Sequence, residues 1–268
     1  MCSGSNVCGF SMPKSDMAQL SKAIGVGVAS GGLSGLLGVG GGILMVPCLV
    51  FLLGTEQRRA HGTSLAAMVL ISAAGLSGFI LTNSVAYAPG LFIFVGSACG
   101  VVVGTWLLDR LEVRTLQVGL AVLMLITAAR FLLLVADSEG HGGLTWLQAL
   151  GYVACGLATG VLSGTMGVGG GIIMIPIMIL FFGFEPTIAK GTSLLVIFPT
   201  SVIGTLRNRH LGNLCPSVAW VVGMAGVASA FVGALGANQL SPRLATSLFA
   251  GLLIVASVQM LHKGLQTR

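Results

Sequence analysis

Two glycine-rich segments contain the residues of this chain whose type and spacing could do chemistry. The first spans Gly38 to Gly42 within GLSGLLGVGGGILMVP at 32–47, and the second spans Gly167 to Gly171 within VLSGTMGVGGGIIMIP at 161–176. The copies lie 129 residues apart and are identical at 11 of 16 positions. Three consecutive glycines leave backbone N–H groups open to a ligand, and a helix that starts there presents its positive end. The pattern therefore favours an anion-binding site.

A polar motif follows each glycine segment at the same spacing, A-H-G-T-S-L at 60–65 and A-K-G-T-S-L at 189–194. Its hydroxyls could cap the next helix or contact a bound oxyanion, and the sequence leaves both roles open. The predicted substrate contacts are Gly40, Gly41, Gly42, Ile43, Thr63 and Ser64 in the first copy and Gly169, Gly170, Gly171, Ile172, Thr192 and Ser193 in the second.

Several further residues could shape the path of an anion. Pro47 and Pro176 lie inside the short helices that follow the glycines, where each removes a backbone donor and favours a helix break. His61 and Lys190 occupy equivalent positions, either as basic residues that attract an anion at the two mouths or as ordinary flanking residues in water. Arg130 lies inside an apolar segment and either lines the path or extends to the membrane surface.

Other chemistries find little support in the sequence. Every Asp and Glu lies in a gap or a tail, which disfavours a cation pump, a metal importer or a carboxylate-driven antiporter. The four histidines are scattered, the six cysteines lack C-x-x-C spacing, and neither H-E-x-x-H nor G-x-S-x-G occurs. Methionines in the short segments hint at transition-metal transport, but packing explains them equally well. We therefore expect no catalytic residue, no metal site and no cofactor.

The elements that must position these residues are membrane helices. Of the 268 residues, 55% are hydrophobic, only 7% are charged and 41 are glycine, and the mean hydropathy is +1.00. Soluble domains carry roughly 25% charged residues, so a soluble enzyme is excluded. The continuous apolar runs also exclude a β-barrel, whose strands alternate polar and apolar residues. A polytopic helical membrane protein remains, and basic residues between helices set orientation and do not indicate nucleic-acid binding.

The 129-residue offset divides nearly the whole chain into two repeats with matching apolar segments. The predicted organisation is an N-terminal tail at 1–16, a first transmembrane repeat at 17–136, an external linker at 137–143, a second transmembrane repeat at 144–262 and a C-terminal tail at 263–268. The apolar segments of the two repeats are 17–37, 43–53, 63–81, 91–108 and 115–136, then 144–166, 172–182, 192–206, 216–237 and 244–261.

The short segments at 43–53 and 172–182 are too short to cross a bilayer. Eleven helical residues reach about 16 Å, roughly half of a 30 Å hydrocarbon core. We expect each to be re-entrant, tilted or a broken half-helix, and the sequence does not decide whether it crosses or returns. If it returns, each half makes an odd number of crossings and the repeats are inverted.

Counting Lys and Arg on each side favours the inverted arrangement. With the N-terminus inside, ten of these residues face the cytoplasm and two, Lys190 and Arg243, face outward, with Arg130 left out. Parallel repeats would divide the same twelve residues six against six. The positive-inside rule therefore predicts two inverted repeats with both termini in the cytoplasm.

The repeated L-S-G-x-x-G-V-G-G-G-x-x-x-x-P and A-[HK]-G-T-S-L motifs resemble those of the TauE/SafE family, the toluene-sulfonate uptake permeases. The resemblance covers residues 20–262 and implies an inner-membrane carrier of sulfite, sulfoacetate or another organosulfonate, without fixing import or export. By resemblance the motif maps onto Gly38, Gly40, Gly41, Gly42, Pro47, Gly62, Thr63 and Ser64, and onto Gly167, Gly169, Gly170, Gly171, Pro176, Gly191, Thr192 and Ser193.

The sequence as a whole predicts an all-α polytopic membrane protein with about 8–10 membrane segments and two inverted repeats, each holding one broken or re-entrant short helix. We expect a transporter that holds a small sulfur oxyanion between the glycine breaks and works by alternating access. The alternative is a membrane enzyme or accessory subunit of a sulfur pathway. The expected partners are the anionic substrate and the lipid bilayer, while a coupling ion (H⁺ or Na⁺), a channel-like mechanism and a homo-oligomer are left open.

Overall fold

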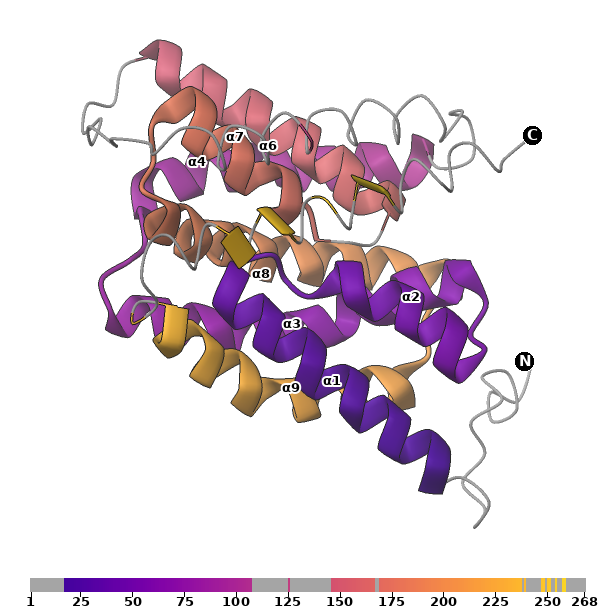
Figure 1. Ribbon diagram of the computed structural model, residues 1–268. Helices are drawn as coiled ribbons and strands as arrows, with labels where there is room; N and C mark the ends of the chain where they lie inside the picture. Colours follow the sequence, from indigo (N-terminus) through magenta and orange to yellow (C-terminus); the bar gives the residue numbers. More distant parts are fainter. Residues whose placement is uncertain are drawn as a thin grey trace.

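The computed structural model is built from helices joined by short turns, with no strand among the residues it describes (Figure 1). It describes residues 17–107, 146–166 and 169–237, and a few isolated positions at 125, 239 and between 247 and 258. The predicted linker at 137–143, both tails and nearly all of the apolar segments at 115–136 and 244–261 lie outside these residues. The helices are α1 (Met17–Leu37), α2 (Gly42–Leu53), α3 (Gln57–Leu81), α4 (Tyr87–Leu107), α6 (Trp146–Met166), α7 (Gly171–Phe182), α8 (Pro186–His210) and α9 (Pro216–Ala237). The all-α prediction is confirmed.

Helices α3 and α8 are longer than the apolar segments that predicted them. They begin at Gln57 and Pro186, six residues before the predicted segments at 63–81 and 192–206, and α8 continues to His210. Pro186 is favourable in the first turn of α8, because that turn has no use for its missing N–H. Hydropathy marks only the apolar part of a helix, so the polar first turns were missed.

The short helices α2 and α7 have 12 residues each, about 18 Å of helix. A left-handed glycine follows each of them, Gly54 (φ 63°) as the C-cap of α2 and Gly183 (φ 67°) as the C-cap of α7. After α1 the chain turns back, so that Gly41 packs against Ser30, and after α6 Gly170 packs in the same way against Thr159. The two short helices therefore pack beside the preceding helix, which is consistent with the predicted re-entrant arrangement.

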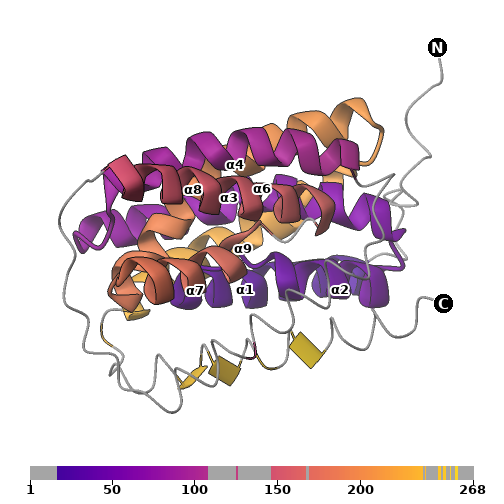
Figure 2. The ribbon, with the colours of Figure 1, turned by 90° about the horizontal axis from the view of Figure 1, so that it is seen from above.

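The long helices pack in a row that reads α1, α9, α3, α8, α4, α6 (Figure 1). Helices that lie 129 residues apart in the sequence are equivalent, which pairs α1 with α6, α4 with α9 and α3 with α8. When each helix in the row is replaced by its equivalent, the same row results in reverse order. Helices α2 and α7 pack at equivalent places, α2 on α1 and α3, and α7 on α6 and α8. Both lie in the lower part of the view in Figure 2, α7 toward the left and α2 toward the right. Each repeat thus packs its first helix against the last described helix of the other repeat.

The central helices α3 and α8 run antiparallel. The start of α3 contacts the loop after α8, where the Cys215 N–H donates to Thr63 Oγ1 at 3.1 Å. The start of α8 contacts the loop after α3, where the Ala86 N–H donates to Thr192 Oγ1 at 2.9 Å. Equivalent helices that run in opposite directions are what inverted repeats require, and the structure is consistent with that prediction.

Glycines allow the outer helix pairs to approach closely. In α4, a Cβ added to Gly96, Gly100 or Gly104 would lie 2.1–2.4 Å from a carbonyl oxygen of α6. Gly27, Gly31 and Gly35 of α1 meet α9 in the same way, at 2.1–2.4 Å. Small residues at four-residue spacing are the usual basis of tight helix pairs in membranes.

Two apolar cores surround the two short helices. Met45, Val46 and Leu49 of α2 belong to one core, while α7 contributes most of its residues to the other. The outside is apolar as well, since side chains such as Val95, Val232 and Phe181 are more than half exposed. Six of the described helices are long and apolar enough to cross a membrane. The molecule is a multi-pass membrane protein, as the composition predicted.

Candidate functional site

The glycine breaks adopt backbone conformations that residues with a side chain rarely take. Gly38, Gly40 and Gly41 have φ angles of 72°, 80° and 73° in the first break. Gly169 and Gly170 have φ angles of 82° and 71° in the second. The left-handed region disfavours any L-residue with a Cβ, so the glycines are required by the turn itself. Gly167, the equivalent of Gly38, lies outside the described residues.

The two breaks touch each other. A Cβ added to Gly171 would lie 3.1 Å from both the Gly38 carbonyl oxygen and the Val39 Cα. Met68 of α3 and Ile197 of α8, which are themselves equivalent in the two repeats, both contact Gly40 and Gly169. Each is the twelfth residue of a 25-residue helix, so the breaks meet beside the middle of the two central helices.

The N-terminal ends of α2 and α7 therefore point into the protein interior. Their N-caps are Gly41 and Gly170, and neither end receives a hydrogen bond from a capping side chain. The carbonyls of these N-caps accept the first helical bonds: the Met45 N–H donates to Gly41 O, and the Ile173 and Met174 N–H groups donate to Gly170 O, each at 3.1 Å. The first amides of each helix carry the positive end of the helix dipole, which attracts negative charge.

The prolines follow one turn later. Pro47 is the sixth residue of α2 and Pro176 is the sixth residue of α7. Since proline has no N–H, the carbonyls of Ile43 and Ile172 lose their intrahelical donor. Gly42, Gly171 and these two isoleucines form the first helical positions, next to the breaks.

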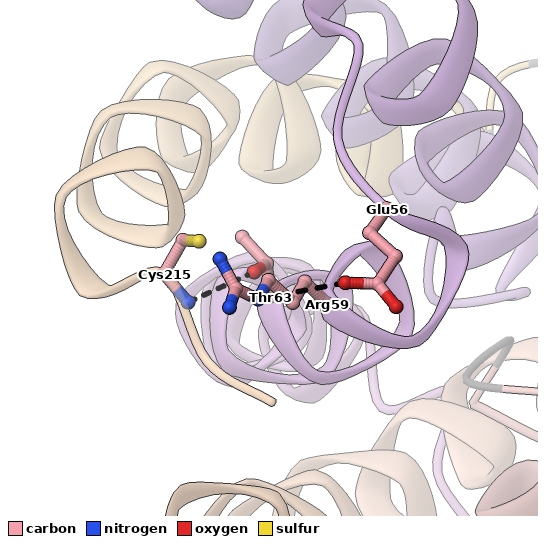
Figure 3. Close-up of polar contacts among 4 residues, drawn as sticks. All are labelled: Glu56, Arg59, Thr63 and Cys215. Carbon is pink, nitrogen blue, oxygen red and sulfur yellow. Dashed lines mark hydrogen bonds and ion pairs between the residues drawn. The ribbon is translucent and has the colours of Figure 1, made fainter. Parts of the chain in front are cut away.

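The Thr-Ser pairs are completely buried, and their hydroxyls bind backbone atoms. Thr63 accepts the N–H of Cys215 in the loop after α8 (Figure 3). Thr192 accepts the N–H of Ala86 in the loop after α3. Ser193 Oγ lies 2.5 Å from Gly38 O and 2.6 Å from Lys190 O, while Ser64 donates to His61 O at 2.8 Å. Ser193 thus ties α8 to the first break, and the threonines tie each central helix to a loop of the other repeat. Whether these hydroxyls also contact a substrate stays a prediction.

The basic candidates differ sharply in their surroundings. Lys190 is only 3% exposed, with its Cα and Cβ packed against Gly38, whereas His61 is half-buried. Lys190 is therefore no flanking residue in water. Arg130 lies outside the described residues. Two residues before His61 in the sequence, Arg59 Nε lies 3.8 Å from Glu56 Oε2 in a partly exposed pair (Figure 3).

The structure adds buried hydroxyls that the sequence analysis did not single out. Ser30, Ser34, Ser163 and Ser201 are at most 1% exposed, and their hydroxyls have no hydrogen-bond partner within the part of the chain that the structure describes. Ser34 and Ser163 are the serines of the repeated L-S-G motif. Their presence in both copies of the motif could have indicated a functional role. A serine among small apolar residues is, however, equally typical of close helix packing.

Comparisons with known proteins agree with the sequence analysis. The model of the family described as "Sulfite exporter TauE/SafE" matches residues 9–131 and 152–268. "Probable membrane transporter protein YunE" of Bacillus subtilis is 27% identical over 267 residues, covering 90% of this chain and 96% of its own. A "Probable membrane transporter protein" of Xylella fastidiosa is 33% identical over 250 residues, covering 86% and 92%. No solved structure matches the chain.

Proposed function

The chain belongs to the sulfite exporter TauE/SafE family and is a membrane transporter, and from that premise we propose its cargo and mechanism. The cargo is a small sulfur-containing anion: sulfite, sulfoacetate or another organosulfonate. The transporter lies in the cell inner membrane with both ends of the chain in the cytoplasm. Its substrate is held where the two glycine breaks meet.

One observation supports this proposal above the others: two uncapped helix N-termini meet in the protein interior. Gly41 and Gly170 have no side-chain cap, and the breaks that they end touch each other between Met68 and Ile197. Backbone N–H groups at a helix start bind oxyanions without any positive side chain. Sulfite and sulfonates present several oxygens that can accept such bonds at once.

The pseudo-symmetric packing supports alternating access. Each repeat contributes one short helix, and the central helices α3 and α8 are equivalent and antiparallel. A rocking motion that opens the site on one face of such a molecule has a counterpart that opens it on the other. The contact between Gly171 and the first break would loosen in one half of the cycle and reform in the other.

Uptake of ³⁵S-sulfite into liposomes that contain the purified protein tests the proposal. The competitors are sulfoacetate, taurine, sulfate and chloride. We expect saturable uptake that sulfoacetate inhibits and chloride does not. Empty liposomes measure the leak, and size-exclusion chromatography of the same preparation confirms that the protein is folded.

No flux above empty liposomes with folded protein would contradict the proposal. It would favour the alternative, a membrane enzyme or accessory subunit of a sulfur pathway, because such a protein would need a partner or a chemical step. Uptake that chloride inhibits as well as sulfoacetate would retain a transporter but remove the sulfur-oxyanion specificity.

A further inference from the structure

Lys190 is a buried cation next to the first break. It lies in the second turn of α8, is 3% exposed and packs through its Cα and Cβ against Gly38. The structure records no ion pair for its ammonium group within the described residues. Charged side chains inside membrane proteins are kept where they meet an opposite charge or line a substrate path. An unpaired ammonium group at this place calls for an anion.

Two hydroxyls beside the same break also lack partners. Ser30 and Ser34 of α1 are fully buried, and neither hydroxyl makes a hydrogen bond within the described part of the chain. Serine and threonine inside helices normally bond a carbonyl one turn earlier. Ser72, Thr159 and Thr205 do so here, each with the carbonyl four residues before it. The hydroxyls of Ser30 and Ser34 are therefore free to bind something else.

These groups are connected through α1. Ser30, Ser34 and Gly38 are spaced four residues apart, so they lie along one face of the helix. At one end of that face, the Cβ of Ser30 would be 3.3 Å from a Cβ on Gly41, the N-cap of α2. At the other end, Gly38 touches Lys190. One face of α1 thus runs from the start of α2, past two hydroxyls without a described partner, to the backbone and Cβ of Lys190.

The second break does not reproduce this set. His61 replaces Lys190 and is half-buried. Thr159 replaces Ser30, and its hydroxyl already donates to Cys155 O at 2.9 Å and Gly156 O at 3.0 Å. Of the hydroxyls at this break, only that of Ser163, the equivalent of Ser34, lacks a partner among the described residues. Lys190 and two of these three hydroxyls without a described partner therefore lie at the first break.

We propose that the anion binds off the pseudo-symmetry axis, at the first break, where Lys190, Ser30 and Ser34 together with the first amides of α2 contact its oxygens. This inference rests on the proposed function and assigns its charged contact to one residue. The site selects for a net negative charge, because a neutral ligand with the same oxygens would leave the ammonium group unpaired.

Sulfite uptake by variants in liposomes tests the assignment. We expect Lys190→Met to raise the KM at least tenfold and Lys190→Arg to restore much of the lost affinity. Ser30→Ala with Ser34→Ala should raise the KM about three- to tenfold, and Ser163→Ala should raise it less than Ser34→Ala. Methanesulfonate should inhibit the wild type, whereas neutral dimethyl sulfone should not.

Matched variants separate binding from general effects. Lys22→Met removes an exposed positive charge from α1, and Ser72→Ala removes a buried hydroxyl that already has a partner. Both should keep the wild-type KM. The serine variants keep the test decisive if Lys190→Met does not fold, since Ser→Ala changes packing little.

The outcomes distinguish this inference from the proposed function. Saturable wild-type uptake with an unchanged KM in Lys190→Met, or in the double serine variant if the lysine variant does not fold, would overturn the site and leave the transporter intact. An equal rise of the KM in Ser163→Ala and Ser34→Ala would overturn the claim that the anion binds at the first break and not equally at both breaks. If the wild type carries no sulfite and sulfite does not raise its melting temperature, both proposals fail. Stabilisation by sulfite that Lys190→Met abolishes would support the site even without flux.

Discussion

At the scale of single residues, the left-handed glycines differ in what surrounds them. A Cβ on Gly41 (φ 73°) would lie 2.7 Å from Ser30 O, whereas a Cβ on Gly54 (φ 63°) would meet nothing within 4 Å. Gly54→Ala should therefore lower the free energy of unfolding by about 1–2 kcal/mol, the cost of holding an alanine in the left-handed conformation. Gly41→Ala should lose more stability and most of the sulfite uptake, because the break must move away from α1.

Thermal unfolding in detergent and uptake in liposomes measure the two effects. Gly170→Ala, where a Cβ would lie 2.9 Å from Thr159 O, should behave like Gly41→Ala. Full activity in both variants would show that the close approach at the breaks is not needed for transport. Comparable losses in Gly54→Ala would show that the strained turn alone explains the effect.

Thr192 allows a test of the two roles that the sequence left open. Thr192→Val keeps the shape but leaves the Ala86 N–H without its acceptor, which costs about 1–3 kcal/mol for a buried group. We expect a lower melting temperature with little change in KM, and Thr192→Ser should retain more of the stability because it keeps the oxygen. A raised KM at unchanged stability would instead indicate contact with the substrate.

The residue types at this site could be predicted, but several of their partners could not. Consecutive glycines indicate left-handed turns, because few other residues adopt the left-handed conformation. Gly41 and Gly170 do adopt it, with φ angles of 73° and 71°. The burial of Lys190 could not be predicted, because it depends on α1 ending against α8. The free hydroxyls of Ser30 and Ser34 depend likewise on the position of α2.

At the scale of elements, the glycine spacing in α4 fixes its distance from α6. A Cβ on Gly100 would lie 2.4 Å from Leu157 O, so Gly100→Ala must push the two helices apart. We expect a loss of about 1–3 kcal/mol in stability, the usual cost of overpacking. Gly25→Ala is the matched control: Gly25 is exposed in α1, has nothing within 4 Å, and should not lose stability.

Thermal unfolding of the two variants in the same detergent decides this. Equal melting temperatures would mean that α4 and α6 adjust without cost.

The short helices α2 and α7 were predictable, since a run of about eleven apolar residues between glycines has few other solutions. The early starts of α3 and α8 were not, because their first turns are polar and are held by tertiary contacts such as that of Thr63.

At the scale of the whole molecule, the repeat was visible in the sequence but the exchange of helices between repeats was not. The offset of 129 residues identifies which helices are equivalent. It does not tell that α1 packs on α9 or α4 on α6, because partner choice depends on surfaces that only the folded chain brings together. The packing of α2 back against α1 also needed the structure, in the contact between Gly41 and Ser30.

The direction of the repeats can be measured with single cysteines in two equivalent loops. Asn83, after α3, is exposed, and Leu211, after α8, is 56% exposed. Because α3 and α8 are antiparallel and Lys and Arg collect on the predicted cytoplasmic side, a membrane-impermeant maleimide should label Asn83→Cys in intact cells. Leu211→Cys should be labelled only in inverted vesicles, and the unsubstituted protein gives the background from native cysteines. Labelling of both positions from one side would require parallel repeats and would remove the structural basis for alternating access, whereas the reverse pattern would keep the inversion but place both termini outside.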